Sequence, residues 1–262
     1  MPRPFFNFRE SCATVPISAM MAHGQHISPL TNLSDGAVHV WAWDAARMES
    51  AERLSNILSL EERCRAARFR QTIHRRDYAV AHVNMRLILG RYLGVPPENV
   101  RYISTASGKP QVVLGSANTP IQFSLSHTQA IGFLAISHGA EIGIDTEFVR
   151  PISRTLASVC FSPYELAQLE ALGNHSWLEG FYRCWTCKEA VLKGEGTGLT
   201  LPLDSFDIDF TSRARPYVAG STLPIASLFR WHLFPLGLMS CVVTSLAVST
   251  YPNNISLFRL IA

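Results

Sequence analysis

Side chains alternate with a period of two across residues 37–45 (AVHVWAWDA), and this period predicts a β-strand. Residues 75–93 instead carry apolar side chains at helical spacing, so we expect a long helix there. Gly94, followed by Pro96 and Pro97, predicts where this helix ends, because glycine adopts the left-handed cap conformation and proline cannot continue a helix.

Two further helices are predicted by the residues that cap their first turns. Ser59 is followed three residues later by Glu62, and at this spacing each side chain bonds the backbone of the other residue. Ser162 is the expected N-cap of a later helix, with Pro163 in its first turn and Glu165 three residues after the cap. We therefore expect helices to begin at both serines.

The remaining pattern organises the chain into two similar units. Three short runs predict strands and one long run predicts a helix: 121–126, 131–137, 141–149 and 177–193. Each unit runs strand, helices, strands, which indicates an α+β protein built from two similar α/β halves. We expect a loosely structured leader over 1–34, an N-terminal half over 35–140, a C-terminal half over 141–250 and a tail over 251–262.

One apolar stretch requires comparison with a membrane span. Residues 233–258 contain no Asp, Glu, Lys or Arg, but Pro235, Gly237 and Pro252 interrupt them. A spanning helix needs about 20 predominantly apolar residues. The richest part, LMSCVVTSLAV, is short and β-branched, so we interpret it as a buried strand and expect a cytoplasmic protein without a membrane partner.

Composition excludes several classes of protein. The chain has 262 residues, 47% of them apolar and 16% charged, against about 25% charged in a typical protein, so a disordered or coiled-coil protein is excluded. The net charge of +3 is too small for a nucleic-acid coat. The six cysteines are scattered and do not form a disulfide framework, and we interpret the CxxC spacing of Cys184 and Cys187 as chance. The first twenty residues do not resemble a secretory signal.

Acidic residues supply the first candidate chemistry. Asp145 and Glu147 lie two residues apart in a predicted strand, so their side chains share a face. Glu189 and Lys193 share a helix face at a spacing of four. Pairs of charged residues at these spacings are also common on ordinary protein surfaces, so neither pair identifies a function alone.

Basic residues supply the second candidate chemistry. Six arginines fall within residues 63–76: Arg63, Arg65, Arg68, Arg70, Arg75 and Arg76. They indicate a phosphate-binding segment, a solvated helix face or a nucleic-acid contact, although Phe69 is the only aromatic residue among them. Lys109 and His127 lie at predicted turns or strand ends. Carboxylates together with these cations suggest Mg²⁺ and a polyphosphate.

Six stretches, in this order, resemble the 4'-phosphopantetheinyl transferases of the surfactin-synthetase-activating type: SGKP (107–110), FSLSHT (123–128), GIDTE (143–147), FSPYEL (161–166), WTCKEAVLK (185–193) and GEGTGLTLPLDSF (194–206). The resemblance implies a monomeric pseudo-dimer of two α/β halves with coenzyme A in the cleft between them. It also implies transfer of 4'-phosphopantetheine from coenzyme A to a serine of an apo acyl or peptidyl carrier protein, with 3',5'-ADP as the other product. Secondary metabolite biosynthesis is the expected context.

The resemblance assigns roles to residues of the second half. Asp145, Glu147 and Glu189 correspond to the Mg²⁺ ligands. Glu189 and Lys193 are also the expected catalytic residues, with Lys193 contacting phosphate. Glu165 of the FSxxE motif has an expected supporting role in catalysis.

The resemblance also assigns contacts with coenzyme A. Lys109, Ser126 and His127 correspond to phosphate contacts, and Asp145 is also an expected coenzyme A-binding residue. Arg65, Arg75 and Arg76 are the candidates for the 3'-phosphate, with Asp77 in a register that the family fills with arginine. A non-catalytic binding module, whose arginines hold nucleic acid or an acidic partner, is the alternative hypothesis; the transferase hypothesis predicts no nucleic-acid partner.

Overall fold

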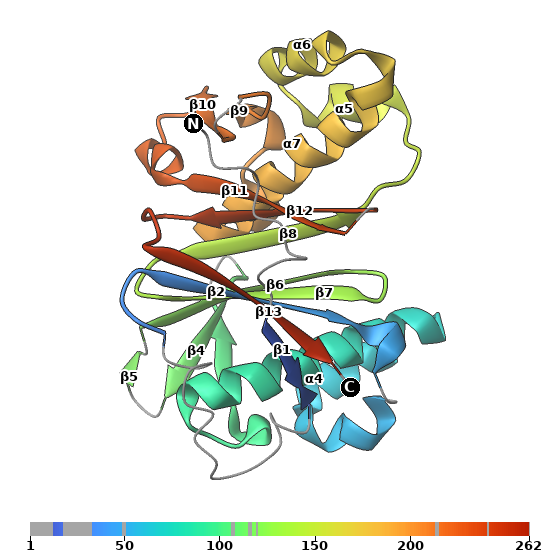
Figure 1. The fold of residues 1–262 in the computed structure, drawn as a ribbon, viewed down its shortest axis with the longest axis vertical. Coiled ribbons are helices and arrows are strands. Elements are labelled where there is room, and N and C mark those ends of the chain that lie inside the picture. The colour runs from blue at the N-terminus through green and yellow to red at the C-terminus, as the bar shows by residue number, and fades with distance from the viewer. Residues whose placement is uncertain are drawn as a thin grey trace.

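The computed structural model describes residues 13–17, 33–48, 51–105, 108–114, 117–118, 120–212, 215–239 and 241–261 (Figure 1). Its strands form two five-stranded sheets and one three-stranded sheet, ordered β1-β13-β2-β7-β6, β8-β12-β11-β10-β9 and β3-β4-β5. The two larger sheets pack face to face, with long helices on their outer faces. The expected α+β fold of two similar halves is confirmed.

The N-terminal half contains these strands and helices: β1 (Ala13–Pro16), β2 (Ala37–Asp44), α3 (Leu60–Ala67), α4 (Thr72–Leu93), β3 (Tyr102–Ser104), β4 (Pro110–Leu114), β5 (Ala117–Asn118), β6 (Ile121–Thr128) and β7 (Ile131–His138). The C-terminal half contains β8 (Ile142–Phe148), α5 (Arg154–Cys160), α6 (Pro163–Ala171), α7 (Gly173–Glu195), β9 (Phe206–Asp209), β10 (Tyr217–Ser221), β11 (His232–Met239) and β12 (Val242–Val248). Strand β13 (Asn254–Ile261) follows. Short 3₁₀-helices cover Ala45–Arg47, Ala51–Ile57, Pro97–Asn99, Gly198–Thr200, Leu203–Ser205 and Ala226–Arg230.

The helix boundaries follow the predicted caps. The backbone N–H of Glu62 donates to Ser59 Oγ over 3.2 Å, and the Glu62 carboxylate accepts the backbone N–H of Ser59 over 2.7 Å. Ser162 and Glu165 make the same reciprocal pair at the start of α6. Helix α4 ends at Gly94, whose φ of 66° is the left-handed cap conformation.

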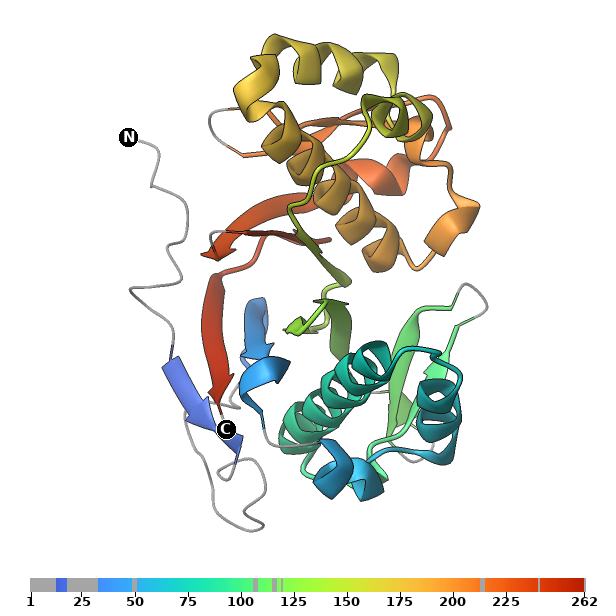
Figure 2. The same cartoon turned by 90° about the vertical axis from the view of Figure 1, so that its right-hand side faces the viewer.

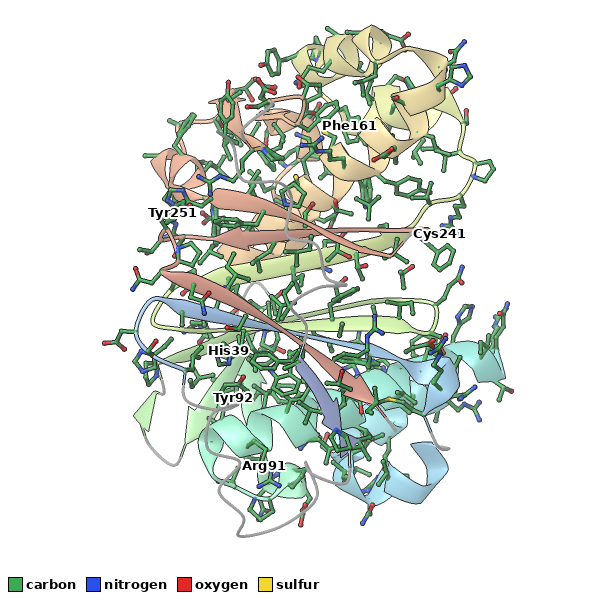
Figure 3. All side chains as sticks on the ribbon, in the orientation of Figure 1. His39, Arg91, Tyr92, Phe161, Cys241 and Tyr251 are labelled. Carbon is green, nitrogen blue, oxygen red and sulfur yellow. The ribbon has the colours of Figure 1, made fainter. Side chains whose placement is uncertain are left out.

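The core of the N-terminal half lies between α4 and its sheet. Trp41 is fully buried there, and its Nε1–H donates to the hydroxyl of Tyr92 over 3.0 Å. The same hydroxyl lies 2.6 Å from Nδ1 of His39, and Figure 3 shows His39 beside Tyr92. A neutral His39 completes this chain, because the Tyr92 hydroxyl then accepts from Trp41 and donates to His39.

The second half brings α7 unusually close to β8. A Cβ atom added at Gly143 would lie 1.9 Å from the carbonyl oxygen of Ala190 and 2.6 Å from the backbone nitrogen of Gly194. Only glycine permits this approach, since any side chain at position 143 would push the helix away. The close packing places the end of α7 beside the GIDTE residues of β8.

The segment 254–261 differs from the expected tail. It forms β13, which lies parallel between β1 and β2 in the N-terminal sheet (Figure 2). Ile255 and Leu257 face the core between the two sheets, whereas Phe258 and Leu260 face the core under α4. A strand buried on both faces carries apolar residues on both, so this run lacks the clean alternation of a surface strand. The proposed boundary between the halves near residue 140 remains a prediction.

The apolar segment after residue 232 forms β11 and β12, which pair antiparallel in the C-terminal sheet. Residues 242–248 of the run LMSCVVTSLAV form the expected buried strand, β12, whereas its first two residues belong to the end of β11. Within the described residues, no helix combines the length and the apolar character needed to cross a membrane.

Candidate active site

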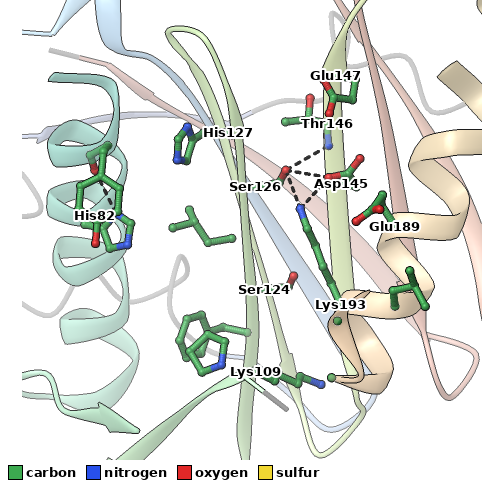
Figure 4. Close-up of a pocket in the computed structure, with 18 of the residues that line it drawn as sticks. His82, Lys109, Ser124, Ser126, His127, Asp145, Thr146, Glu147, Glu189 and Lys193 are labelled. Carbon is green, nitrogen blue, oxygen red and sulfur yellow. Dashed lines mark hydrogen bonds and ion pairs between the residues drawn. The ribbon is translucent and has the colours of Figure 1, made fainter. Parts of the chain in front are cut away.

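A cavity of about 690 Å³ opens between the two halves (Figure 4). Its walls come from α3, α4, β6, β8 and α7 and from the turn before β4. The residues of the N-terminal half that line it include Arg65, Phe69, Tyr78, His82, Lys109, Ser124, Ser126 and His127. Those of the C-terminal half include Asp145, Thr146, Glu147, Trp185, Glu189, Leu192 and Lys193. Most of the residues that the sequence singles out therefore meet in one place.

Asp145 is the buried acid at the centre of the cavity wall. Its Oδ1 accepts a hydrogen bond from Lys193 Nζ over 2.6 Å and another from Ser126 Oγ over 3.1 Å. Its Oδ2 is also buried and has no hydrogen-bond partner among the described residues. A buried carboxylate oxygen without a donor is expensive, so a cation at this oxygen would stabilise the folded protein.

Glu147 and Glu189 line the cavity beside Asp145. Burial raises the pKa of the Glu147 carboxyl, and the charge of Asp145 raises it further. The pKa of Glu189 is raised by the same two causes in the same order. Mutual repulsion among carboxylates is relieved by a divalent cation, and carboxylate oxygens are the ligands that Mg²⁺ prefers.

The three carboxylates share one cavity without surrounding a common point. Among the described residues, no group of three or more His, Cys, Asp or Glu side chains is gathered closely enough to hold a metal ion. Lys193 instead supplies the positive charge next to Asp145. The donor set and the unpartnered Oδ2 fit a hard cation, although the three carboxylates would have to move closer together to hold one.

Ser124 and Ser126 join the two halves at this site. Ser124 Oγ accepts the backbone N–H of Ile144 over 3.1 Å, and Ser126 Oγ accepts that of Thr146 over 3.2 Å. These bonds connect β6 of one sheet to β8 of the other. Ser126 also accepts from Lys193 and donates to Asp145, so one donor and two acceptor positions of its hydroxyl are used.

Two histidines line the side of the cavity formed by the N-terminal half. Burial lowers the pKa of His127, and the charge of Lys193 lowers it further. Burial also lowers the pKa of His82 to about 4. The ring of His82 stacks on Tyr78 at a centroid distance of 3.9 Å. No sequence motif marked Tyr78 and His82 as site residues, although their spacing of four in a helix places them on one face.

The three arginine candidates separate in the structure. Arg65 lines the cavity, with its guanidinium 5.7 Å from the centre of the Tyr78 ring. Arg75 donates to the carbonyl oxygen of Phe69 over 3.3 Å, and Arg76 donates to that of Ala45 over 2.9 Å. The structure does not place Arg75 or Arg76 in the cavity wall.

Asp77 lies in α4, next to Arg75 and Arg76 in the sequence and near His127 of β6. Its side chain is buried, and burial raises its pKa while the charge of His127 opposes that effect. Asp77 does not line the cavity.

Glu165 lies apart from the cavity, contrary to a role beside the reacting groups. Its carboxylate is fully buried, lies 2.6 Å from Lys188 Nζ and accepts the backbone N–H of Ile208 over 2.8 Å. Together with its bond to Ser162, these contacts connect α6, α7 and β9. These internal partners give Glu165 a structural part in the fold, and its expected supporting role in catalysis stays a prediction.

Lys109 lines the cavity, but its ammonium group is engaged inside the protein. Lys109 Nζ donates to the carbonyl oxygen of Gly194 over 2.6 Å and to the carboxylate of Glu141. Ser107 of the same SGKP motif lies outside the described residues.

Comparison with known proteins places this architecture in a class. The sequence model of the 4'-phosphopantetheinyl transferase superfamily matches residues 141–250. The chain is 39% identical over 187 residues to the 4'-phosphopantetheinyl transferase HetI of Nostoc sp. (strain PCC 7120), which covers 70% of this chain and 77% of HetI. It is 32% identical over 163 residues to the 4'-phosphopantetheinyl transferase Sfp of Bacillus subtilis (strain 168), which covers 61% of this chain and 70% of Sfp.

A search of solved structures matches the holo-acyl-carrier-protein synthase AcpS of Thermotoga maritima, with a TM-score of 0.34 and 19% identity over 41% of this chain and 61% of that chain. The family of this chain follows from the sequence relatives. The chain belongs to the 4'-phosphopantetheinyl transferase family, as the resemblance of its motifs implied.

Proposed function

We propose that this enzyme transfers the 4'-phosphopantetheine group of coenzyme A to a serine hydroxyl of an apo acyl or peptidyl carrier protein and releases 3',5'-ADP. The observation that carries the proposal is the meeting of Asp145, Glu147, Glu189 and Lys193 in one cavity between the halves of a chain of this family. A volume of about 690 Å³ lies within the usual range for a ligand site, roughly 300 to 1,000 Å³.

The proposed cofactor is Mg²⁺, held by Asp145, Glu147 and Glu189. When bound, it offsets the negative charge of the pyrophosphate. The unpartnered Oδ2 of Asp145 and the raised pKa values of Glu147 and Glu189 support this assignment. With its charge at Asp145 replaced by such a cation, Lys193 would be available to contact a phosphate oxygen.

The proposed reaction is a displacement at phosphorus. The carrier serine oxygen attacks the β-phosphorus of coenzyme A, and the bond from this phosphorus to the oxygen bridging the two phosphates breaks, so that 3',5'-ADP leaves. Glu189 accepts the serine proton, and Lys193 stabilises or protonates the departing phosphate. Transfer of this kind depends chiefly on positioning and charge stabilisation, which the rigid β6–β8 junction provides.

The nucleotide is proposed to lie toward α4. Arg65 is the candidate for the 3'-phosphate, because it is the one of the three proposed arginines that lines the cavity. Burial disfavours the charged forms of His82 and His127, and both rings are proposed to offer hydrogen bonds to the nucleotide. We further propose that the enzyme works as a monomer in the cytoplasm and that its carriers belong to secondary metabolism.

The first test is the intact mass of an apo carrier protein after incubation with the enzyme, coenzyme A and Mg²⁺. We expect a gain of one phosphopantetheine, which EDTA and the Asp145→Ala variant abolish. Glu170→Gln, in an exposed ion pair with Arg154, is the matched control and retains the gain. If a folded enzyme modifies neither acyl nor peptidyl carriers, the proposal is wrong and a binding role for the arginine segment is favoured.

A further inference from the structure

Lys109 lies just before β4 and is joined to Thr105 by two hydrogen bonds. The backbone N–H of Thr105 donates to the carbonyl oxygen of Lys109 over 2.9 Å, and the backbone N–H of Lys109 donates to Thr105 Oγ1 over 3.1 Å. Gly108 adopts a φ of 89°, which glycine tolerates and other residues rarely adopt. The turn directs a Lys109 side chain that is only 6% exposed toward the C-terminal half (Figure 4).

The ammonium of Lys109 reaches the end of α7. Its 2.6 Å hydrogen bond goes to the carbonyl oxygen of Gly194, in the last turn of that helix. The last carbonyl groups of a helix have no partner within the helix, and a cation near them interacts favourably with the helix dipole. Lys109 therefore caps α7 from the opposite half of the molecule.

Glu141 completes this arrangement just before β8. Its carboxylate accepts a hydrogen bond from the same ammonium, and its backbone N–H donates to Ser249 Oγ over 2.9 Å. Lys109 is consequently held between a helix end and a carboxylate that both belong to the C-terminal half. Both partners of the ammonium group therefore belong to the protein itself.

The last turn of α7 is also fixed on its other sides. A Cβ atom at Gly194 would lie 2.4 Å from the ring of Trp231, and Trp231 Nε1–H donates to the carboxylate of Glu195 over 2.7 Å. Lys193 lies in this same turn and extends its ammonium to Asp145. The position of the turn therefore sets the position of Lys193.

We propose that Lys109 and Glu141 are positioning residues that fix the end of α7, and thereby Lys193, rather than contacts for a phosphate of coenzyme A. The proposal rests on the proposed function for the reaction that Lys193 serves. It separates two roles for Lys109 that have opposite kinetic signatures. A phosphate contact contributes to binding of coenzyme A, whereas a positioning residue contributes to turnover.

The test compares Lys109→Met and Glu141→Gln in steady-state carrier modification and in calorimetric binding of coenzyme A. We expect both variants to lower kcat about tenfold to a hundredfold, because small displacements of a reacting group are costly. We expect KM and Kd for coenzyme A to stay within about twofold of the wild type, since the ligand loses no contact. Lys109→Arg keeps the positive charge and can still donate to both acceptors, so it should retain most of the turnover.

A second readout does not depend on activity. Backbone amides in the last turn of α7 should exchange hydrogen faster in both variants, because the cap that restrains the turn is weakened. The double variant should show the same kcat and the same amide exchange rates as Lys109→Met, since both changes break one linked arrangement. Glu170→Gln is the matched control for loss of a carboxylate and should change neither exchange nor kinetics.

Several outcomes would overturn the proposal. A rise of tenfold or more (roughly 1.4 kcal/mol) in the Kd for coenzyme A of Lys109→Met, with kcat unchanged, would make Lys109 a phosphate contact. Unchanged kcat and exchange in Glu141→Gln would contradict a positioning role even if Lys109→Met does not fold, because Glu141 is partly exposed and the substitution keeps its shape. If the wild-type enzyme modifies no carrier, the proposed function fails, while the exchange experiment still decides the cap.

Discussion

The Nζ of Lys193 lies 2.6 Å from Oδ1 of Asp145, on one oxygen of a buried carboxylate whose other oxygen has no partner among the described residues. The ammonium group of Lys193 thus already neutralises part of the carboxylate charge that a metal ion would bind. An ammonium and a divalent cation compete for the same negative charge, so binding of either one weakens binding of the other.

This competition predicts the effect of Lys193→Met on metal binding. Without coenzyme A, we expect the variant to bind Mn²⁺, a spectroscopic substitute for Mg²⁺, about tenfold more tightly, which corresponds to roughly 1.4 kcal/mol. Free Mn²⁺ measured by electron paramagnetic resonance reports the affinity, and Asp145→Asn should weaken it. Equal affinities of the wild type and Lys193→Met would contradict the competition.

Arg65 is predicted to recognise the 3'-phosphate. Arg65→Met should raise KM for coenzyme A about tenfold, as expected for loss of one charged hydrogen-bonding group, and should affect dephospho-coenzyme A much less. Arg76→Met is the matched control, since its side chain bonds the backbone carbonyl group of Ala45, which does not line the cavity. An equal rise for both substrates would place Arg65 elsewhere on the nucleotide.

Gly143→Ala should push α7 away from β8. The added Cβ would approach the carbonyl oxygen of Ala190 to 1.9 Å, so backbone must move. We expect the free energy of unfolding to fall by about 1–3 kcal/mol, as for other overpacked cores. Denaturant unfolding gives the loss, and carrier modification should fall with it because Glu189 and Lys193 move with the helix. Unchanged stability would mean that the helix relaxes freely.

Glu165 and Lys188 form a fully buried ion pair, and we predict a structural effect for it. Glu165→Gln should destabilise the fold by about 3–5 kcal/mol, because the ammonium of Lys188 is left buried without a countercharge. Replacing Lys188 as well, as in Glu165→Gln with Lys188→Met, should restore much of that loss, because no charge is left unpaired and the amide oxygen still accepts a backbone N–H. Thermal unfolding measures each variant, and a loss of turnover without loss of stability would instead support the catalytic role first expected for Glu165.

His39 predicts how stability depends on pH. Burial lowers its pKa to about 4 from an ordinary value of 6.5. Below pH 6.5 the unfolded chain therefore binds a proton at His39, whereas the folded protein does so only near pH 4. The stability from this residue is complete above this window and falls as the pH drops through it. The loss from this residue is about 3 kcal/mol.

Comparing the wild type with His39→Gln isolates this contribution. Glutamine retains a hydrogen-bond acceptor for Tyr92 and does not titrate. The free energy of unfolding, measured from pH 7 to pH 4, should fall less steeply in the variant. Parallel curves for the two proteins would show that His39 is protonated in the folded state.

Local features of the fold were predictable because their causes are local. Ser59, Ser162 and Gly94 begin or end helices through contacts with residues three or four positions away. The GIDTE acids share a face because a strand alternates, and the structure confirms that Asp145 and Glu147 line the same cavity. The family resemblance added the pairing of the two halves.

Features that depend on distant partners were not predictable. The partners of Lys109 are Glu141 and Gly194, and nothing in the SGKP motif indicates that its ammonium turns toward them. Glu165 carries a motif typical of the family, but its burial against Lys188 follows only from the packing of α6 on α7. The N-terminal strand β1 and the final strand β13 pair across almost the whole chain, which no short-range pattern reveals.

The place of β13 between β1 and β2 has a consequence for biosynthesis. A ribosome completes β2 long before it reaches residues 254–261, so one edge of β2 in the nascent chain stays without its neighbour while the whole C-terminal half is made. An unpaired strand edge is open to association with other chains. Although each half has its own sheet and helices, the N-terminal sheet is complete only after a strand that follows the whole C-terminal half has been made.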